Sequence, residues 1–553
     1  MSKRLAITIS GAVSLGSFEA GVLYEIIHAI GQHNQNPDTP AERRLFIDVL
    51  TGASAGGMSA TIAAQKLLFE RNSLDGPYSN ALYSPWVIDA DLESLLAMHG
   101  QDDPSQSIFS SQSVIDISKR YLTARYENGP SPAPIRHSAC AARLHLGLAL
   151  ANLNGVDCGL ALRPAGQFIY TRHQDQLAVR LDAMNAQDDA LAVWDPLRNA
   201  AVSCGAFPFA FRVIEVQRQA ADYTNPAPIT PLTGACAFAY TDGGTFQNEP
   251  LGLAKNLVDQ IDGHLDVDNR FYLFIAHGPK TSTASGSFNA GQANFRNTAL
   301  RLAGSIFDQA RFQDWVTAEA VNSQVALFNR RAEQLRDWLR EPLPEANQRA
   351  AVLQHAASAL LPGLFSTESP VSNGRAPETL DQARARLRAQ FLSDYNRLPA
   401  TTRDVWIDSI LTLEKAASLA SRDEMTIFGI TAGQNELAGA ELCAFAGFFD
   451  RRYRDHDYDL GRQKAQQFLQ QETSFGPIQY TPETIRPIDT ALNGLKLEQM
   501  DRPLREQVRD RLRVRLREMI KEAGLNPWLI GGVVRGAIDL VFIKPELEKL
   551  LGL

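Results

Sequence analysis

The most informative segment of the sequence is Thr51-Gly52-Ala53-Ser54-Ala55-Gly56-Gly57. It follows the apolar run 46–50 and leads into a segment rich in small residues that continues to about residue 68. An apolar run, a glycine loop and a helical pattern in succession are typical of a strand, a sharp turn and a helix. We therefore predict that Ser54 lies on a turn between a buried strand and a helix.

The same order of elements occurs at the start of the chain. The apolar run 5–9 ends in Ser10-Gly11, and a helical pattern follows over residues 17–30. Further strand candidates are residues 144–150, 168–170, 235–240 and 271–276. Strand, glycine loop and helix repeated in this way indicate parallel strands. We predict an α/β fold with a mainly parallel central sheet flanked by helices.

The character of the sequence changes beyond about residue 280. A stretch rich in Ser, Gly, Thr and Asn is followed by long helical patterns over residues 298–360 and 376–422. We predict three parts: an α/β catalytic domain over residues 1–280, a helical insertion over 281–424, and a helical C-terminal region over 425–553. Two roles stay open for the insertion, a lid over the site and a helical scaffold packed on the sheet. Residues 71–140, rich in Ser, Pro and Asp, are predicted to be surface excursions.

Composition excludes several classes of protein. The chain has 553 residues, 44% of them hydrophobic, and a net charge of −8, which gives no electrostatic reason to expect nucleic acid as a partner. The five cysteines are widely spaced and form no C-x-x-C pair, so we expect neither disulfides nor a zinc site, and a cytoplasmic location. No uninterrupted apolar run reaches about eighteen residues, so no membrane-spanning helix is expected.

Ser54 is the first candidate for chemistry. A serine on a strained strand-to-helix turn exposes its hydroxyl group, and Gly52 and Gly56 relieve crowding around it. The N–H of Ala55 lies at the start of the following helix, where an anion is stabilised. The alternative is a plain glycine turn without chemistry.

Two other candidate loops follow the ends of predicted strands. Asp242-Gly243-Gly244 follows the run 235–240, which predicts a carboxylate at the crevice where α/β sheets bind ligands; a simple Asp-Gly turn is the alternative. The loop Ser10-Gly11-Ala12-Val13-Ser14-Leu15-Gly16 offers backbone N–H groups to a developing oxyanion. Its alternative is an ordinary glycine-containing connection between strand and helix. The missing phosphate-binding motif argues against a phosphate-binding loop.

Taken in this order, the three loops resemble those of the patatin-like phospholipase family. The resemblance covers about residues 4–280. The matching residues are 11–16 with Ala20-Gly21-Val22-Leu23, 52–56, 200–208, and Thr241-Asp242-Gly243-Gly244 with Asn248 and Pro250. A weaker similarity, over residues 448–462, is to a segment of some larger bacterial patatin-related proteins.

The resemblance implies a lipid acyl hydrolase that works through an acyl-enzyme, with a lipid or phospholipid ester as substrate and no metal or other cofactor. It implies Ser54 as nucleophile and Asp242 as its partner. The implied oxyanion donors are the N–H groups of Gly11, Ala12, Val13 and Ala55, and the motif glycines are Gly16, Gly52, Gly56, Gly243 and Gly244.

The loop after the first strand departs from the family pattern, Gly-Gly-Gly-x-Arg-Gly. Ala12 and Val13 replace two glycines, and Leu15 replaces the arginine. Because Ala and Val adopt positive φ poorly, the geometry of the oxyanion hole depends on these two residues. Three alternatives therefore stay open: a non-catalytic lipid- or protein-binding member of the fold, an acyltransferase, and a hydrolase with a triad in which His277 is the base.

The C-terminal region carries an apolar stripe flanked by arginines, at Leu504, Val508, Leu512, Leu516 and Ile520. A stripe of this kind is typical of a helix on an anionic membrane surface. The alternative, packed C-terminal helices, is the one that we favour.

Overall fold

The computed structural model describes residues 2–278, 379–416 and 425–495, single positions and short runs between 298 and 361, and residues 502, 503 and 506. Short gaps interrupt the longer ranges, at 98, 104, 128–133, 162–166, 183–189, 209, 224–226, 263–268, 434, 441–443 and 472–475. The predicted apolar stripe of the C-terminal region lies outside the described residues.

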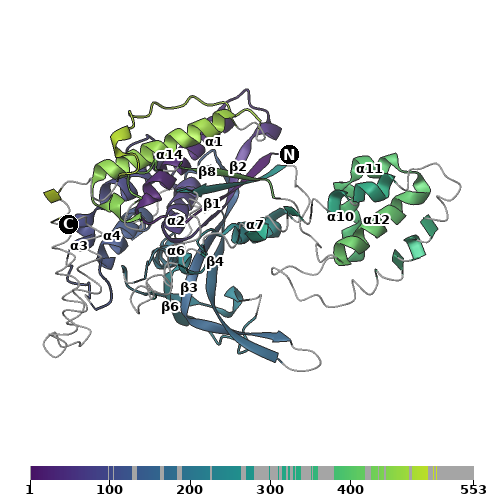
Figure 1. Ribbon diagram of the computed structural model, residues 1–553, viewed down its shortest axis with the longest axis horizontal. Helices are drawn as coiled ribbons and strands as arrows, with labels where there is room; N and C mark the ends of the chain where they lie inside the picture. The colour runs from purple at the N-terminus through teal and green to yellow at the C-terminus, as the bar shows by residue number, and fades with distance from the viewer. Residues whose placement is uncertain are drawn as a thin grey trace.

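Eight strands form one sheet, in the spatial order β5-β6-β3-β2-β1-β7-β8, with β4 paired to β3. Strands β3, β2, β1, β7 and β8 are parallel, whereas β4 and β6 pair antiparallel with β3 and β5 antiparallel with β6. The mainly parallel sheet predicted from the sequence is therefore confirmed (Figure 1). The strands are β1 (Lys3–Ile9), β2 (Leu45–Gly52), β3 (Cys140–Ala161), β4 (Gln167–Asp182), β5 (Ile214–Arg218), β6 (Cys236–Asp242), β7 (Arg270–Ala276) and β8 (Ile427–Thr431).

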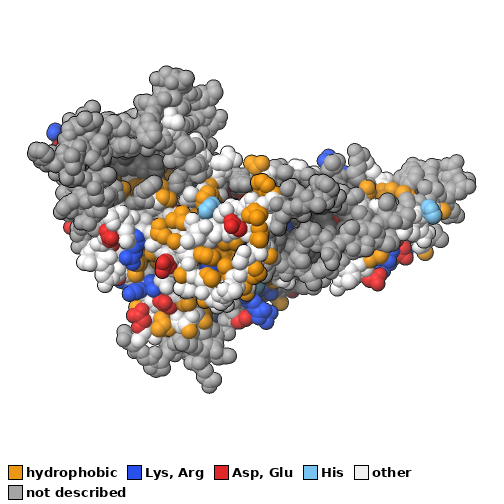
Figure 2. Space-filling model, turned by 90° about the horizontal axis from the view of Figure 1, so that it is seen from below, with side chains coloured by type: hydrophobic (Ala, Val, Ile, Leu, Met, Phe, Trp, Pro, Cys, Tyr) orange, Lys and Arg blue, Asp and Glu red, His pale blue; other side chains and the backbone are white. Residues whose placement is uncertain are grey.

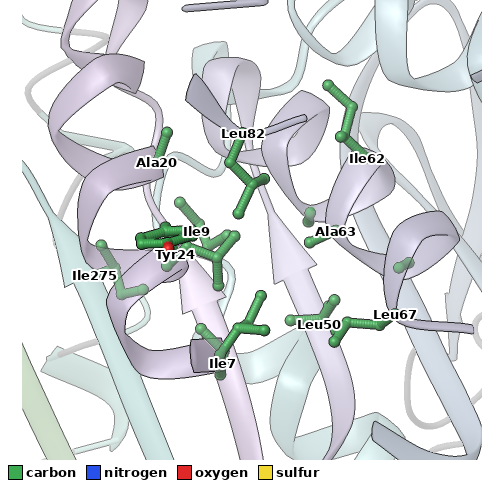
Figure 3. Close-up of a cluster of buried hydrophobic side chains, with 14 of the residues drawn as sticks. Ile7, Ile9, Ala20, Tyr24, Leu50, Ile62, Ala63, Leu67, Leu82 and Ile275 are labelled. Carbon is green, nitrogen blue, oxygen red and sulfur yellow. The ribbon is translucent and has the colours of Figure 1, made fainter. Parts of the chain in front are cut away.

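Helices cover both faces of the sheet. Ile7 and Ile9 of β1 lie in a buried cluster with α1 and α2, whereas Ala6 lies in a second cluster with α7. Successive side chains of a strand point to opposite faces, so a strand covered on both faces is apolar throughout. Figure 3 shows Ile7, Ile9 and Leu50 facing the helices of the first cluster. These helices are α1 (Gly16–Gln35), α2 (Ser54–Phe69) and α7 (Leu251–Asp262); α3 (Leu92–Leu96), α4 (Ser111–Leu122), α5 (Ala124–Glu127) and α6 (Ala190–Cys204) connect the strands between them.

The first helix is unusually apolar. Among the described residues, the segment Val13–Gln35 is long and apolar enough to cross a membrane by composition, and 89% of its apolar window is buried inside the protein. The sheet lies on one side of α1 and α14 (Arg451–Gln471) on the other (Figure 1). Burial on both sides accounts for this composition in a core helix.

α14 and α1 pack with their backbones in contact. A Cβ atom on Gly21 would come within 2.1 Å of the Tyr458 carbonyl oxygen, and one on Gly461 within 2.1 Å of the Phe18 carbonyl oxygen. The C-terminal segment therefore belongs to the α/β core.

The same segment also supplies the strand β8, which pairs with β7. The region after residue 425, which the sequence predicts to be mostly helical, therefore also contains a strand. A run of five residues, Ile427–Thr431, gives too short a periodic signal to be assigned from sequence.

Helices α10 (Leu380–Gln390), α11 (Leu392–Arg397) and α12 (Ala400–Ala416) form a group with its own apolar core, which includes Trp406 and Ile410. Figure 1 shows this group beside the sheet, away from α1 and α2. The helical character predicted for this part of the chain is confirmed for these three helices, while the division into three domains stays a prediction.

Strands β3 and β4 form a long hairpin that extends below the rest of the sheet (Figure 1). The side chains of Phe168 and Ile169 on this hairpin are 56% and 57% exposed. On the described part of the face seen from below, hydrophobic side chains lie among charged ones of both signs (Figure 2).

Candidate active site

Ser54 lies on the turn between β2 and α2, as the sequence predicts. β2 ends at Gly52 and α2 begins at Ser54, whose φ of 51° is in the left-handed region. This conformation is strained for a residue with a side chain, and such strain concentrates at functional sites. A Cβ atom on Gly56 would lie 2.3 Å from the Ser10 carbonyl oxygen. Glycine at this position therefore lets the turn pack against the end of β1.

Asp242 is in direct contact with Ser54, 188 residues away in the sequence. Ser54 Oγ donates a hydrogen bond of 2.6 Å to Asp242 Oδ2, and the N–H of Gly244 donates to Oδ1 at 2.7 Å. The distances suit proton transfer between the hydroxyl and the carboxylate.

Asp242 ends the strand β6, as the sequence predicts. This strand is antiparallel to β3. β3 pairs through Leu148 with Gly52 of β2, and through Leu150 with Asp242 of β6. β6 thus runs back along the extended part of β3 and ends at the level of the turn.

The carboxyl group of Asp242 is buried, with 1% of the residue exposed. Burial raises the pKa of Asp242 to about 7, because loss of water disfavours the charged form; hydrogen bonds from Ser54 and Gly244 offset part of this effect. An ordinary aspartate, with a pKa of about 3.9, is a weak base at neutral pH. The buried site supplies the basicity that an exposed aspartate lacks.

Gly11 brings the loop after β1 close to Ser54. A Cβ atom on Gly11 would lie 2.9 Å from the Cβ atom of Ser54 and 2.1 Å from Oδ1 of Asn248. The N–H of Gly11 already donates to the Asn248 carbonyl oxygen at 3.1 Å. The structure therefore assigns Gly11 a steric role, in place of the oxyanion donor that the sequence suggested.

The two replaced glycines of this loop differ in conformation. Ala12 has an ordinary φ of −139°, whereas Val13 has a φ of 52°. The backbone strain expected from the sequence therefore falls on Val13 alone. Val13 begins a 3₁₀ turn, Val13–Leu15, and Ala55 is the second residue of α2. N–H groups at these positions have no partner within their own helix, so both can donate to an anion.

A cavity that is partly open to solvent lies beside Ser54. Hydrocarbon side chains dominate its lining, which includes Met58, Ile62, Trp86, Leu95, Ile117 and Phe207. A cavity with this lining suits an acyl chain and offers few partners to a polar group.

Much of this lining could not be assigned from sequence. Trp86, Leu95 and Ile117 come from the part of the chain predicted to be surface excursions, and Phe448 comes from beyond residue 425. That prediction is wrong for these residues: Trp86 is buried and its indole N–H donates to Ser59 Oγ at 2.9 Å. Trp86 and Leu95 lie on helices of six and five residues, where hydrophobic periodicity is a poor guide.

None of the residues lining the cavity comes from the described part of the segment 281–424. The described helices α10–α12 therefore give no support to the lid role. Among the described residues, no group of three or more His, Cys, Asp or Glu side chains is placed to hold a metal ion.

The sheet and the Ser54–Asp242 pair define an α/β protein with a serine on a strand-to-helix elbow. A family model described as Patatin-like phospholipase matches residues 7–255, which include the elbow and Asp242. Residues 7–255 are thus similar to patatin-like phospholipases, and a lipid is the substrate that this similarity implies. No curated protein matches the chain.

Proposed function

We propose that this protein hydrolyses carboxylic esters of lipids, with Ser54 as nucleophile and Asp242 as general base. The observation that carries the proposal is the 2.6 Å hydrogen bond from Ser54 to a buried carboxylate, next to an apolar cavity. The cavity binds the acyl chain and leaves the ester carbonyl at Ser54. The alcohol part of the lipid then lies toward solvent.

In the first step Ser54 Oγ attacks the carbonyl carbon while its proton moves to Asp242 Oδ2. The negative charge that develops on the carbonyl oxygen is held by the N–H groups of Ala12, Val13 and Ala55. The tetrahedral intermediate collapses, the bond to the alcohol breaks, and the alcohol leaves with the proton from Asp242.

The second step repeats this chemistry with water. Asp242 takes a proton from a water molecule that attacks the acyl-enzyme. When the intermediate collapses, the fatty acid leaves and the proton returns to Ser54 Oγ. Gly244, whose N–H holds the other carboxylate oxygen, keeps Asp242 oriented through both steps.

Chain-length dependence tests the assignment of the cavity. We expect kcat/KM for p-nitrophenyl esters to rise at least about tenfold from acetate to octanoate, because each buried methylene contributes about 0.8 kcal/mol. Released p-nitrophenol gives the rate. Ile117→Trp, which fills part of the cavity, is the matched control: it should slow octanoate cleavage and leave acetate cleavage nearly unchanged. Equal effects on both esters would contradict an acyl site in this cavity.

Further assays on the same protein distinguish hydrolysis from the two alternative functions. A fluorophosphonate probe should label Ser54, as located by peptide mass spectrometry, and phospholipid should release free fatty acid. A protein that neither cleaves esters nor reacts with the probe would instead be the non-catalytic binding member of the fold. Preferential transfer of the acyl group to an added alcohol would indicate an acyltransferase.

His277 is the base in the rival triad mechanism. It follows β7, which pairs with β1, and it is not among the residues that line the cavity beside Ser54. We expect His277→Ala to lower kcat by far less than the roughly 10²–10⁴-fold that a general base contributes. Thermal unfolding of the variant controls for loss of folded protein. A decrease as large as that of a Ser54 variant would refute the Ser54–Asp242 pair.

A further inference from the structure

The loop that carries Val13 is held from outside by a distant segment. We call this segment, residues 437–440 and 444–449, the brace; it lies between β8 and α14 in the chain. Ser14, which follows Val13, is buried with 1% exposed. Its hydroxyl group donates to the Ala444 carbonyl oxygen and accepts from the Gly447 N–H at 3.1 Å. Both hydrogen bonds of this hydroxyl are made to the brace.

The brace and the loop are also in steric contact. A Cβ atom on Gly447 would lie 2.4 Å from Ser14 Oγ, and one on Gly439 would lie 3.1 Å from Cδ2 of Leu15. Glycines at these positions let the two backbones approach.

Buried charged side chains of α14 fix the brace itself. The Asp457 carboxylate accepts from the N–H groups of Ala438 and Gly439 at 2.7 and 2.9 Å. The Arg454 guanidinium donates to the carbonyl oxygens of Gly447 and Phe448, both at 3.0 Å. Asp457 is fully buried and Arg454 is 2% exposed. Hydrogen bonds to charged groups in buried surroundings are strong and directional, so the brace is held in one conformation.

Val13 needs such support. A β-branched residue in the left-handed region is strained, and it stays there only where its surroundings leave no alternative. The Val13 side chain packs against two buried clusters, one of which includes Phe448 of the brace. In the resembling family this position is a glycine, which adopts positive φ without strain.

We propose that Ser14 is a positioning residue of the active site: clamped by the brace, its hydroxyl group holds Val13 in the strained conformation and so sets the N–H groups that receive the oxyanion. The role in binding the oxyanion rests on the proposed function. The hold of the brace on Ser14 and Val13 does not depend on it. The chain thus replaces a flexible glycine by support from residues more than 400 positions away.

The test is Ser14→Ala in the full chain. Because a misplacement of about 1 Å at a reacting centre costs up to about 10²-fold, we expect kcat for p-nitrophenyl butyrate to fall about 10- to 100-fold with KM nearly unchanged. Adding Val13→Gly to this variant should restore much of the lost kcat, since glycine does not need the clamp. Unchanged kcat in Ser14→Ala, or no recovery on adding Val13→Gly, would overturn the proposal.

Tyr83→Phe is the matched control. The Tyr83 hydroxyl donates to Asp455 of α14 at 2.6 Å and accepts from Arg451, so its loss removes hydrogen bonds to α14 and none to Ser14. We expect kcat to be unchanged. If Tyr83→Phe lowers kcat as much as Ser14→Ala does, the effect is one of general stability and the positioning role is refuted.

Hydrogen exchange gives a readout that does not depend on activity. The peptide covering residues 11–16 should exchange faster in Ser14→Ala than in the wild type, and no faster in Tyr83→Phe. Equal exchange in Ser14→Ala and wild type would refute the clamp. If the wild type cleaves no ester, the proposed function fails, while the exchange measurement still decides whether the brace holds the loop.

Discussion

Replacing Ser54 with alanine should lower kcat/KM for ester substrates by roughly 10⁴-fold or more, because the covalent route is lost while the cavity still binds the acyl chain. Ser54→Gly should lose activity to the same extent. Steady-state rates with an octanoate ester measure both variants. Residual activity in either variant above about 1% of wild type would show that another group performs the chemistry.

The two Ser54 variants should differ in stability. Alanine retains the strain of a φ of 51° at this position, whereas glycine removes it. Glycine also gains freedom in the unfolded chain, which offsets part of the benefit. We therefore expect the free energy of unfolding in urea to be about 0.5 kcal/mol or more higher for Ser54→Gly than for Ser54→Ala. The opposite order would mean that the turn imposes no strain on its side chain.

Asp242→Asn should lower kcat by at least about 10²–10⁴-fold, the contribution of a general base. The amide keeps an oxygen for the Gly244 N–H and an NH₂ group beside Ser54 Oγ, so the site stays hydrogen-bonded. The variant should also be more stable than the wild type at neutral pH, and the gain should depend on pH.

The sign of this dependence follows from the raised pKa of Asp242, about 7 in the folded protein against about 3.9 unfolded. Between these values the folded state keeps a proton that the unfolded state has lost, so the contribution of Asp242 to stability falls as pH rises. The advantage of Asp242→Asn should be near zero below about pH 4, grow up to pH 7, and level off on the order of 4 kcal/mol. Urea unfolding at pH 4.5 and pH 8 measures it; an advantage that shrinks with rising pH would exclude a raised pKa.

Activity should show the same ionisation. Since the proposed mechanism needs the carboxylate form of Asp242, kcat/KM of the wild type should fall on the acid side of about pH 7.

The parts of the fold that sequence predicted correctly are those that have strong local signals. The elbow at Ser54 combines an apolar run, glycines and a helical pattern within about twenty residues, and the structure places it where these signals predict. Asp242 could be proposed from its Asp-Gly-Gly context. The reason why it reaches Ser54, an antiparallel strand returning along β3, depends on long-range pairing that local sequence does not encode.

The parts that sequence could not predict depend on contacts between distant residues. Phe448 enters the cavity and Gly447 contacts Ser14 because α14 packs on α1. The strain at Val13 was expected from its side chain, but the brace that accompanies it was not, since nothing near residue 440 marks it as part of the site. Short elements such as η4 (Ser84–Asp89), which carries Trp86, also give no clear periodic signal in the sequence.

The position of β8 and α14 late in the sequence also affects how the chain folds during synthesis. β7 ends at residue 276, and 150 residues follow before its partner β8 begins. While they emerge from the ribosome, one edge of the sheet is unpaired and the outer side of α1 is uncovered. Open strand edges and exposed apolar helices are sites of aggregation and chaperone binding. Chain contacts this far apart also form slowly. The pairing of β7 with β8 forms only after most of the chain has been translated, so we expect a nascent chain ending near residue 280 to expose these surfaces to chaperones.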